Sequence, residues 1–182
     1  PQMVANMKVN NMDGFCVGEP WGGVAVKEDI GFTAITTQDI WKHHPEKSLV
    51  VNGEFVAKRR DDLKLVMRAI LEAGKCIDTD AASHNQTAEV IDNRLEGKYD
   101  LGSNLGSTTY KEDTMLFHNG GKVNFPRRGH GAWYLAQYVR FGYLKELPDV
   151  KAISSKLILS DLYAEVAKEM EIPVPGDDWE PF

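Results

Sequence analysis

The side chains best suited to binding a small polar ligand gather in one stretch, between positions 11 and 47 of the 182-residue chain. This stretch holds two of the four tryptophans and two of the five histidines. It also holds three consecutive hydroxyl and amide side chains, Thr36, Thr37 and Gln38. Hydroxyl, amide and imidazole groups can donate hydrogen bonds to such a ligand. The sequence therefore places its candidate binding site here.

Sequence signatures of common catalytic and nucleotide sites are absent: the chain has no G-x-S-x-G, no H-E-x-x-H and no phosphate-binding loop. The adjacent His43 and His44 would point to different faces of a regular helix, so they cannot both ligate one metal. On residue type alone, each histidine fits a solvated position at a helix end better than a ligand contact. Trp21 and Trp41 are by type more often core residues, although both lie beside predicted strand ends.

Composition limits the classes of protein and partner. Hydrophobic residues make up 42% of the chain and charged residues 26%, as in soluble globular domains. The 27 acidic residues outnumber the 21 basic ones, and the basic residues form no stripe along the sequence. Both observations argue against a nucleic-acid partner. No apolar run approaches the ~20 residues of a membrane span. The first residues lack the apolar region of a signal peptide, and we expect them to start within a helix.

Apolar runs and helical periodicity predict strands that alternate with helices in the first half of the chain. Strands are predicted at 14–18, 32–37 and 48–52, and the first and the last of them are expected to be buried. Helices are predicted at 2–9, 18–26, 39–43, 61–75, 131–144 and 160–170, with a weaker one at 87–95. The pair Asn119-Gly120 predicts a hairpin over 115–125, and composition predicts a loop over 97–109.

This alternation favours a parallel or mixed sheet covered by helices. In open sheets of this kind the ligand lies outside the carboxyl ends of the strands. Here the turns at those ends are residues 18–21 and 36–38. A helix that begins after each turn would direct free backbone amides outward, and such amides suit an anion.

Five blocks of sequence carry more specific information. They are MDGFCVGEPW (12–21), ITTQDIWKHHPEK (35–47), LVVNGEF (49–55), RLEGKYDLG (94–102) and VNFPRRGHGAWYLAQYVRFGYL (123–144). Together they resemble the nitrate- and bicarbonate-binding proteins of ABC transporters. The resemblance implies an α/β fold of the periplasmic-binding-protein type II, with two lobes, mixed sheets flanked by helices, and a ligand cleft between the lobes.

The family's chain order implies how this partial chain is divided. Residues 1–47 would finish the second lobe and form the crossover. Residues 48–182 would return to the first lobe and add the C-terminal helices. The chain would then be roughly the C-terminal half of such a protein, with a shorter segment between Cys76 and Arg94 than the family usually carries.

The resemblance also assigns part of the site, residue by residue. His44, before Pro45, matches the histidine that contacts the anion in nitrate-binding members, which reverses the interpretation of a solvated histidine. Thr36-Thr37-Gln38 could donate hydrogen bonds at the same strand end, and Trp21 would form a cleft wall. Lys98 is the candidate for a lysine of nitrate-binding members; bicarbonate-binding members place a glutamate there and use calcium.

The expected function is the solute-binding component of an ABC uptake transporter that binds nitrate or nitrite without catalysis. Its expected partners are a small inorganic anion and the transporter's permease and ATPase. No cofactor is expected unless the ligand is bicarbonate, which would require calcium. The protein would lie in the periplasm or on the outer face of the inner membrane, held there only by a lipid anchor outside this chain.

Three alternatives belong to the same wider group. The first is a calcium-dependent bicarbonate-binding protein, and the second is a cytoplasmic nitrate sensor. The third is a thiamine-pyrimidine synthase, whose branch carries a cysteine-rich iron-binding motif. That enzyme is disfavoured because this chain has only Cys16 and Cys76, far apart in the sequence.

Overall fold

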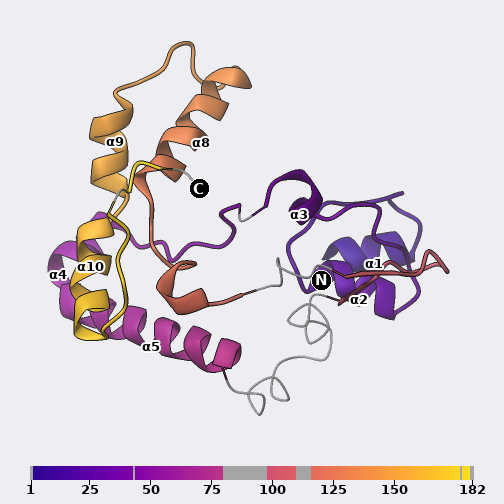
Figure 1. The fold of residues 1–182 in the computed structure, drawn as a ribbon. Helices are drawn as coiled ribbons and strands as arrows, with labels where there is room; N and C mark the ends of the chain where they lie inside the picture. Colours follow the sequence, from indigo (N-terminus) through magenta and orange to yellow (C-terminus); the bar gives the residue numbers. More distant parts are fainter. Residues whose placement is uncertain (1, 43, 80–97, 110–115, 177, 181–182) are drawn as a thin grey trace. The chain divides into compact units, whose positions relative to one another are not determined.

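The computed structural model describes residues 2–42, 44–79, 98–109, 116–176 and 178–180. The chain forms two compact units (Figure 1). Residues 1–44 and 79–116 form the first unit, and residues 45–78 and 117–182 form the second. The division into lobes at residues 1–47 and 48–182 stays a prediction. The helix predicted at 87–95 lies outside the described residues.

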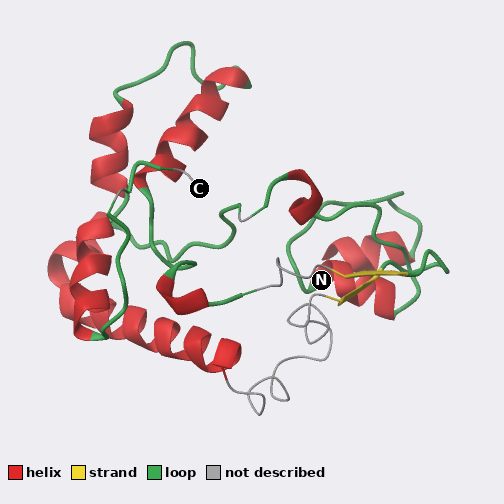
Figure 2. Ribbon diagram, viewed as in Figure 1, coloured by secondary structure: helices red, strands yellow, loops and turns green. Residues whose placement is uncertain are grey.

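The first unit combines short helices with one hairpin. Its described elements are α1 (Gln2–Lys8), α2 (Trp21–Lys27), α3 (Thr37–Ile40), β1 (Lys98–Asp100) and β2 (Ser107–Thr109). Helices α1 and α2 contact each other, and each contributes a buried side chain, Val4 and Ala25. Strands β1 and β2 pair antiparallel, with Lys98 opposite Thr109 (Figure 2). This hairpin replaces the loop predicted over 97–109, because strands of three residues carry too little periodicity to be recognised.

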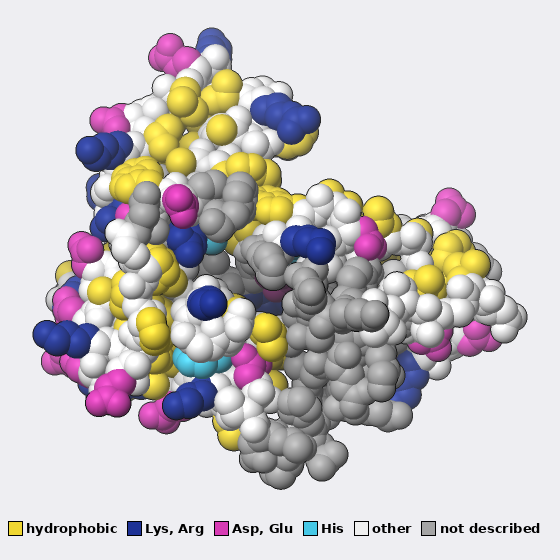
Figure 3. Space-filling view, viewed as in Figure 1, with side chains coloured by type: hydrophobic (Ala, Val, Ile, Leu, Met, Phe, Trp, Pro, Cys, Tyr) yellow, Lys and Arg dark blue, Asp and Glu magenta, His cyan; other side chains and the backbone are white. Residues whose placement is uncertain are grey.

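The strands predicted at 14–18, 32–37 and 48–52 are wrong, since none of these segments forms a strand. Some of their apolar side chains are exposed, with Ile35 at 61% and Val50 at 82% (hydrophobic surface is yellow in Figure 3). A strand requires a hydrogen-bonded neighbour. Within the described ranges these segments have no ladder partner, so the expected mixed sheets reduce to one two-stranded sheet.

In the described part of the second unit, all of the regular secondary structure is helical. It consists of α4 (Gly53–Lys58), α5 (Arg60–Thr79), the 3₁₀ helix η1 (Asn119–Gly121), α8 (Arg128–Arg140), α9 (Val150–Leu157) and α10 (Ser160–Glu169). The helices predicted at 2–9, 61–75 and 160–170 are confirmed, whereas α8 begins and ends earlier than predicted and α4 and α9 were missed. No helix that the structure describes has the length and apolar character needed to cross a bilayer.

The core of the second unit lies where α5 and α10 meet the segment before α8. Its buried cluster consists of Leu71, Phe125, Tyr163, Val166 and Ala167. The rings of Phe125 and Tyr163 meet edge to face, with centroids 5.6 Å apart. Three members, Tyr163, Val166 and Ala167, come from α10 at a spacing of three and four residues, which places them on one face of that helix.

Ion pairs run along the contact between α5 and α10. Arg60 and Lys64 both bind Glu165, at 2.5 and 2.6 Å, and Arg68 pairs with Glu169. Hydrogen bonds from Lys64 and Arg60 lower the pKa of the Glu165 carboxyl. The four-residue spacing of the partners on both helices keeps the pairs in register. Because most of these side chains are substantially exposed, the pairs set the helix alignment more than they stabilise the unit.

One carboxylate fixes the end of α5 to the chain that enters η1. Asp78 accepts hydrogen bonds from the backbone N–H groups of Phe117, His118 and Asn119, at 2.9, 2.8 and 2.8 Å. These amides cannot also join a strand ladder, which explains why the hairpin predicted over 115–125 is wrong. Asn119 and Gly120 do adopt positive φ values, 46° and 62°, but they do so within η1.

Replacing Asp78 by alanine should lower the free energy of unfolding by about 2 kcal/mol, because three amides lose a charged acceptor. The variant should recover a few tenths of a kcal/mol of this loss, because it removes a negative charge from the negative, C-terminal end of the α5 dipole. Urea denaturation of the full-length protein measures the difference. Asp61→Ala, at the opposite end of α5, is the control; an equal loss in both variants would contradict the role of Asp78.

Tyr163 is buried with no hydrogen-bond partner for its hydroxyl among the described residues, and burial raises its pKa from 10.0 to about 12. The unfolded chain therefore ionises first, so stability falls as the pH rises from 10 toward 12. Tyr163→Phe should raise the free energy of unfolding by about 1 kcal/mol at neutral pH. The variant should also lack the part of the fall in stability between pH 10 and 12 that the ionisation of Tyr163 causes.

Thermal or urea denaturation across this pH range checks the prediction for Tyr163. Tyr143→Phe removes a hydroxyl from a ring that is 77% exposed and should change little. A loss of stability in Tyr163→Phe with none in Tyr143→Phe would mean that the buried hydroxyl does have a partner.

Candidate functional site

A single turn of helix, α3, builds the candidate site in the first unit. Thr36, just before the turn, donates its backbone N–H and its hydroxyl to the Asp39 carboxylate, at 3.2 and 2.9 Å. The backbone N–H of Asp39 donates in return to the Thr36 carbonyl, at 3.1 Å. This reciprocal cap closes the turn. The hydroxyl proton of Thr36 is thereby used on Asp39, which makes Thr36 a capping residue in this state.

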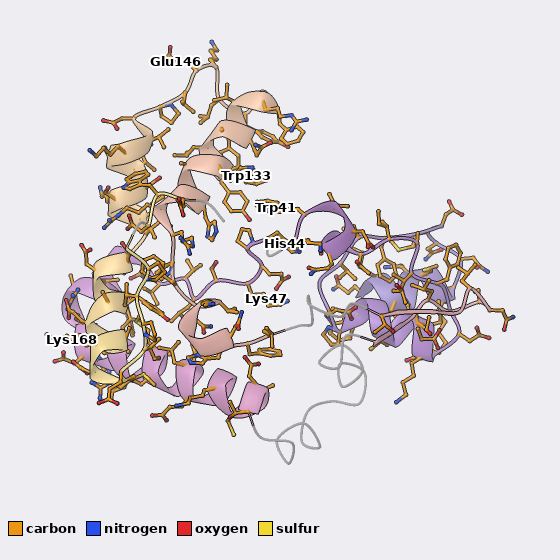
Figure 4. All side chains as sticks on the ribbon, in the orientation of Figure 1. Trp41, His44, Lys47, Trp133, Glu146 and Lys168 are labelled. Atoms are coloured by element: carbon orange, nitrogen blue, oxygen red, sulfur yellow. The ribbon has the colours of Figure 1, made fainter. Side chains whose placement is uncertain are left out.

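His44 lies against the same turn. Its Nε2 atom is 2.7 Å from the hydroxyl oxygen of Thr37. The ring of Trp41 lies beside the imidazole, with centroids 6.1 Å apart and 51° between the planes (Figure 4). The backbone N–H of Trp41 also donates to the Thr37 carbonyl, at 2.8 Å. Thr37 and Trp41 therefore hold His44 from the two ends of one turn, and we call these three residues the His44 group.

The His44 group offers a hydrogen-bonding imidazole beside an aromatic surface. An imidazole donates one hydrogen bond when neutral and two when protonated. The adjoining indole ring removes part of the surrounding water, and polar interactions are stronger where water is excluded. Such a group suits a small oxyanion. The sequence pointed to Thr37 and His44 but not to Trp41, because the contact between Trp41 and His44 depends on how the turn is closed and spacing alone does not predict it.

The structure does not bring every predicted residue to this group. Trp21 begins α2 and is partly buried, and no described contact joins it to the His44 group. Glu19 accepts the backbone N–H of Gly23 at 3.2 Å and so belongs to the start of α2. Gln38 is the second residue of α3 and is partly buried. The ligand contacts of Trp21 and Gln38 stay predictions.

Lys98 belongs to the same unit as the His44 group, and its backbone lies in β1. The position of its side chain lies outside what the structure describes. The hairpin that carries it is fixed to the segment that leads into α3, because the Thr33 N–H donates to the Leu101 carbonyl at 2.7 Å. Gly102, at φ +80°, approaches Gly31 so closely that a Cβ would lie 2.9 Å from its carbonyl oxygen. The role of Lys98 stays a prediction.

Among the described residues, no three or more histidine, cysteine, aspartate or glutamate side chains are arranged to hold a metal ion. Cys16 and Cys76 are both exposed.

Comparison with known proteins identifies the family. Residues 1–92, half of the chain, match the NMT1-like family. The chain belongs to the NMT1-like family. It is 34% identical to the nitrate/nitrite binding protein NrtA of Synechococcus elongatus over 98% of its own length. It is 27% identical to the bicarbonate-binding protein CmpA of the same organism over 94% of its length.

The fold of this NMT1-like chain also matches that of a solved structure. The crystal structure of the periplasmic nitrate-binding protein NrtA from Synechocystis PCC 6803 matches with a TM-score of 0.86 and 31% identity, over 97% of this chain. The resemblance inferred from the five sequence blocks is thereby confirmed. The chain spans 43% of the Synechococcus NrtA, 42% of CmpA and 50% of the crystallised chain. These relatives are named as binding proteins.

Proposed function

We propose that this NMT1-like protein is the solute-binding component of an ABC uptake transporter and binds nitrate or nitrite in a cleft between two lobes. The observation that carries the proposal is the contact of His44 with Thr37 and Trp41, at the histidine that the resemblance assigns to the anion. Identity supports nitrate over bicarbonate, because it is 34% to a nitrate/nitrite binding protein and 27% to a bicarbonate-binding protein.

The chemistry of nitrate fits these residues. Nitrate is planar, carries one negative charge and accepts weak hydrogen bonds, so it needs fixed donors and a cation in a site that excludes water. In this proposal His44 donates a hydrogen bond, Trp41 and Trp21 supply apolar walls, Gln38 adds a donor, and Lys98 supplies the positive charge.

The proposed partners and location follow from the transport role. The bound anion would be delivered to a membrane permease driven by an ATPase. The protein would work in the periplasm or on the outer face of the inner membrane, in line with the crystallised relative, which is a periplasmic protein by name.

Bicarbonate with calcium is the second candidate, and the 27% identity to a bicarbonate-binding protein favours it. Calcium is held by carboxylate and carbonyl oxygens. A lysine at position 98 would repel the cation in such a site. The bicarbonate candidate therefore requires that a carboxylate elsewhere, and not Lys98, occupies the position facing the anion.

Calorimetric titration of the full-length protein with nitrate and with bicarbonate, each with and without calcium, separates the two candidates. The proposal predicts tight nitrate binding that does not change with calcium. Bicarbonate binding that depends on calcium would overturn the assignment of nitrate and of Lys98. Binding of neither anion would overturn both candidates.

His44→Ala should weaken nitrate binding at least tenfold, about 1.4 kcal/mol, because a positioned donor is lost. Circular dichroism should show an unchanged fold, since His44 is not part of the buried core. His43→Ala removes the adjacent imidazole and is the matched control, with affinity expected to stay near that of the wild type. Equal affinity of the wild type and His44→Ala would show that His44 is not a ligand.

A further inference from the structure

The second unit contains a pocket of about 340 Å³, formed by α5, the chain before η1 and the end of α10. One side of the pocket is apolar, because Leu71 belongs to the buried core cluster and Met170 and Ile172 pack against that cluster. The volume falls within the range of ~300–1,000 Å³ that is typical of small-molecule sites. All of the lining residues belong to the second unit, whereas the His44 group belongs to the first.

A buried histidine lines this pocket. His118 is only 5% exposed, and its Nδ1 atom has no hydrogen-bond partner among the described residues. Nearly all buried polar groups in folded proteins have such a partner, and an exception calls for a specific explanation. A buried imidazole without a partner in the wall of a pocket points to a ligand that supplies one.

The backbone holds His118 at the pocket from more than one side. The N–H of His118 donates to the Asp78 carboxylate at 2.8 Å. The preceding residue, Phe117, lies so close to Gly74 of α5 that a Cβ on this glycine would be 2.8 Å from the Phe117 carbonyl oxygen. The ring is thus placed by contacts of its backbone, which leaves its own hydrogen-bonding capacity for a ligand.

The pocket also presents charges of both signs. Arg68, Glu72 and Lys75 line it from α5, where their spacing places them on one face of the helix. Arg68 pairs with Glu169 of α10, but a guanidinium has five N–H donors, and the Nε atom has no partner among the described residues. A carboxylate, Glu72, lies one helical turn from Arg68 and can accept from a cation. Donors, an acceptor and an apolar surface therefore surround one space.

We propose that this pocket binds a small zwitterion of the α-amino-acid type with an apolar side chain. The ligand's carboxylate accepts hydrogen bonds from the Arg68 guanidinium and from the His118 ring. Its ammonium group donates to Glu72, and its side chain covers the apolar side of the pocket. The site is separate from the proposed nitrate site and does not depend on it.

The mixed lining decides between this ligand and simpler ones. A carboxylate oxygen only accepts hydrogen bonds, so it satisfies the N–H groups of Arg68 and His118. A simple acid would bring its negative charge beside Glu72 with no cation to compensate for it. A simple amine would leave the donors of Arg68 and His118 without an acceptor. An inorganic anion would leave the apolar side uncovered, and only the zwitterion uses all three parts of the pocket.

The first test is an NMR titration of the full-length protein with L-leucine, in which the His118 ring signal is assigned by its absence in His118→Phe. Leucine should shift this ring signal and the backbone amide signal of Met170 in a saturable manner. Two probes each lack one charge: 4-methylpentanoate has no ammonium group, and 3-methylbutylamine has no carboxylate. Both should bind at least roughly fivefold more weakly, as expected for the loss of one charged contact. No shift with leucine, or equal binding of either probe, would overturn the proposal.

The second test uses variants in the same titration. His118→Phe keeps a ring but lacks the N–H, and Glu72→Gln removes an exposed carboxylate without changing its size. Each should weaken leucine binding roughly fivefold, with an unchanged circular dichroism spectrum. Glu146→Gln, in the connection between α8 and α9, alters a carboxylate that does not line the pocket and is the matched control (Figure 4). Wild-type affinity of Glu72→Gln would overturn the proposal even if His118→Phe failed to fold.

Cross-titration separates this site from the proposed nitrate site. Leucine should bind His44→Ala as it binds the wild type, and nitrate should bind Glu72→Gln as it binds the wild type. Loss of leucine binding in His44→Ala would place the amino acid at the His44 group and would overturn the pocket assignment. If nitrate does not bind at all, the proposed function fails while the leucine titrations still decide this inference.

Discussion

The reciprocal cap between Thr36 and Asp39 is the constraint on which the candidate site depends. A helix of one turn has few hydrogen bonds of its own, so it needs an external closure to keep one geometry. The Asp39 carboxylate provides that closure by accepting both the N–H and the hydroxyl of Thr36. With the turn closed, Thr37 and Trp41 are held where both contact His44. A capping interaction thus becomes a way of positioning an imidazole.

In the second unit, apolar residues form a buried cluster. Helices α5 and α10 enclose a compact cluster, and Asp78 ties the end of α5 to a segment about forty residues later in the chain. None of these contacts involves the His44 group. The packed cluster of the second unit is therefore separate in the sequence from the turn that carries the candidate site. Such a separation is common, because binding residues are frequently placed on short connections held by rigid elements.

The sequence predicted the amphipathic helices well and the strands poorly, for physical reasons. The helices at α1, α5 and α10 satisfy their backbone hydrogen bonds locally, so their periodicity is sufficient to identify them. A strand depends on a neighbour that its own residues do not encode, and the segments around Ile35 and Val50 have none among the described residues. The hairpin at Asn119-Gly120 failed because a distant carboxylate, Asp78, takes the amides that a ladder would need.

The candidate site was predicted chiefly through family resemblance. Residue types alone favoured a solvated histidine at position 44, and only the resemblance of the surrounding block assigned it to the ligand. The hydrogen bond to Thr37 and the ring contact with Trp41 could not be derived from spacing, because they depend on how one short turn is closed. Lys98 is the assignment that the structure advances least, since only its backbone pairing is described.

A crystal structure of the full-length protein grown with nitrate tests the central claim most directly. The account predicts planar trigonal density within hydrogen-bonding distance of the His44 imidazole. Nitrate bound away from His44 would contradict it.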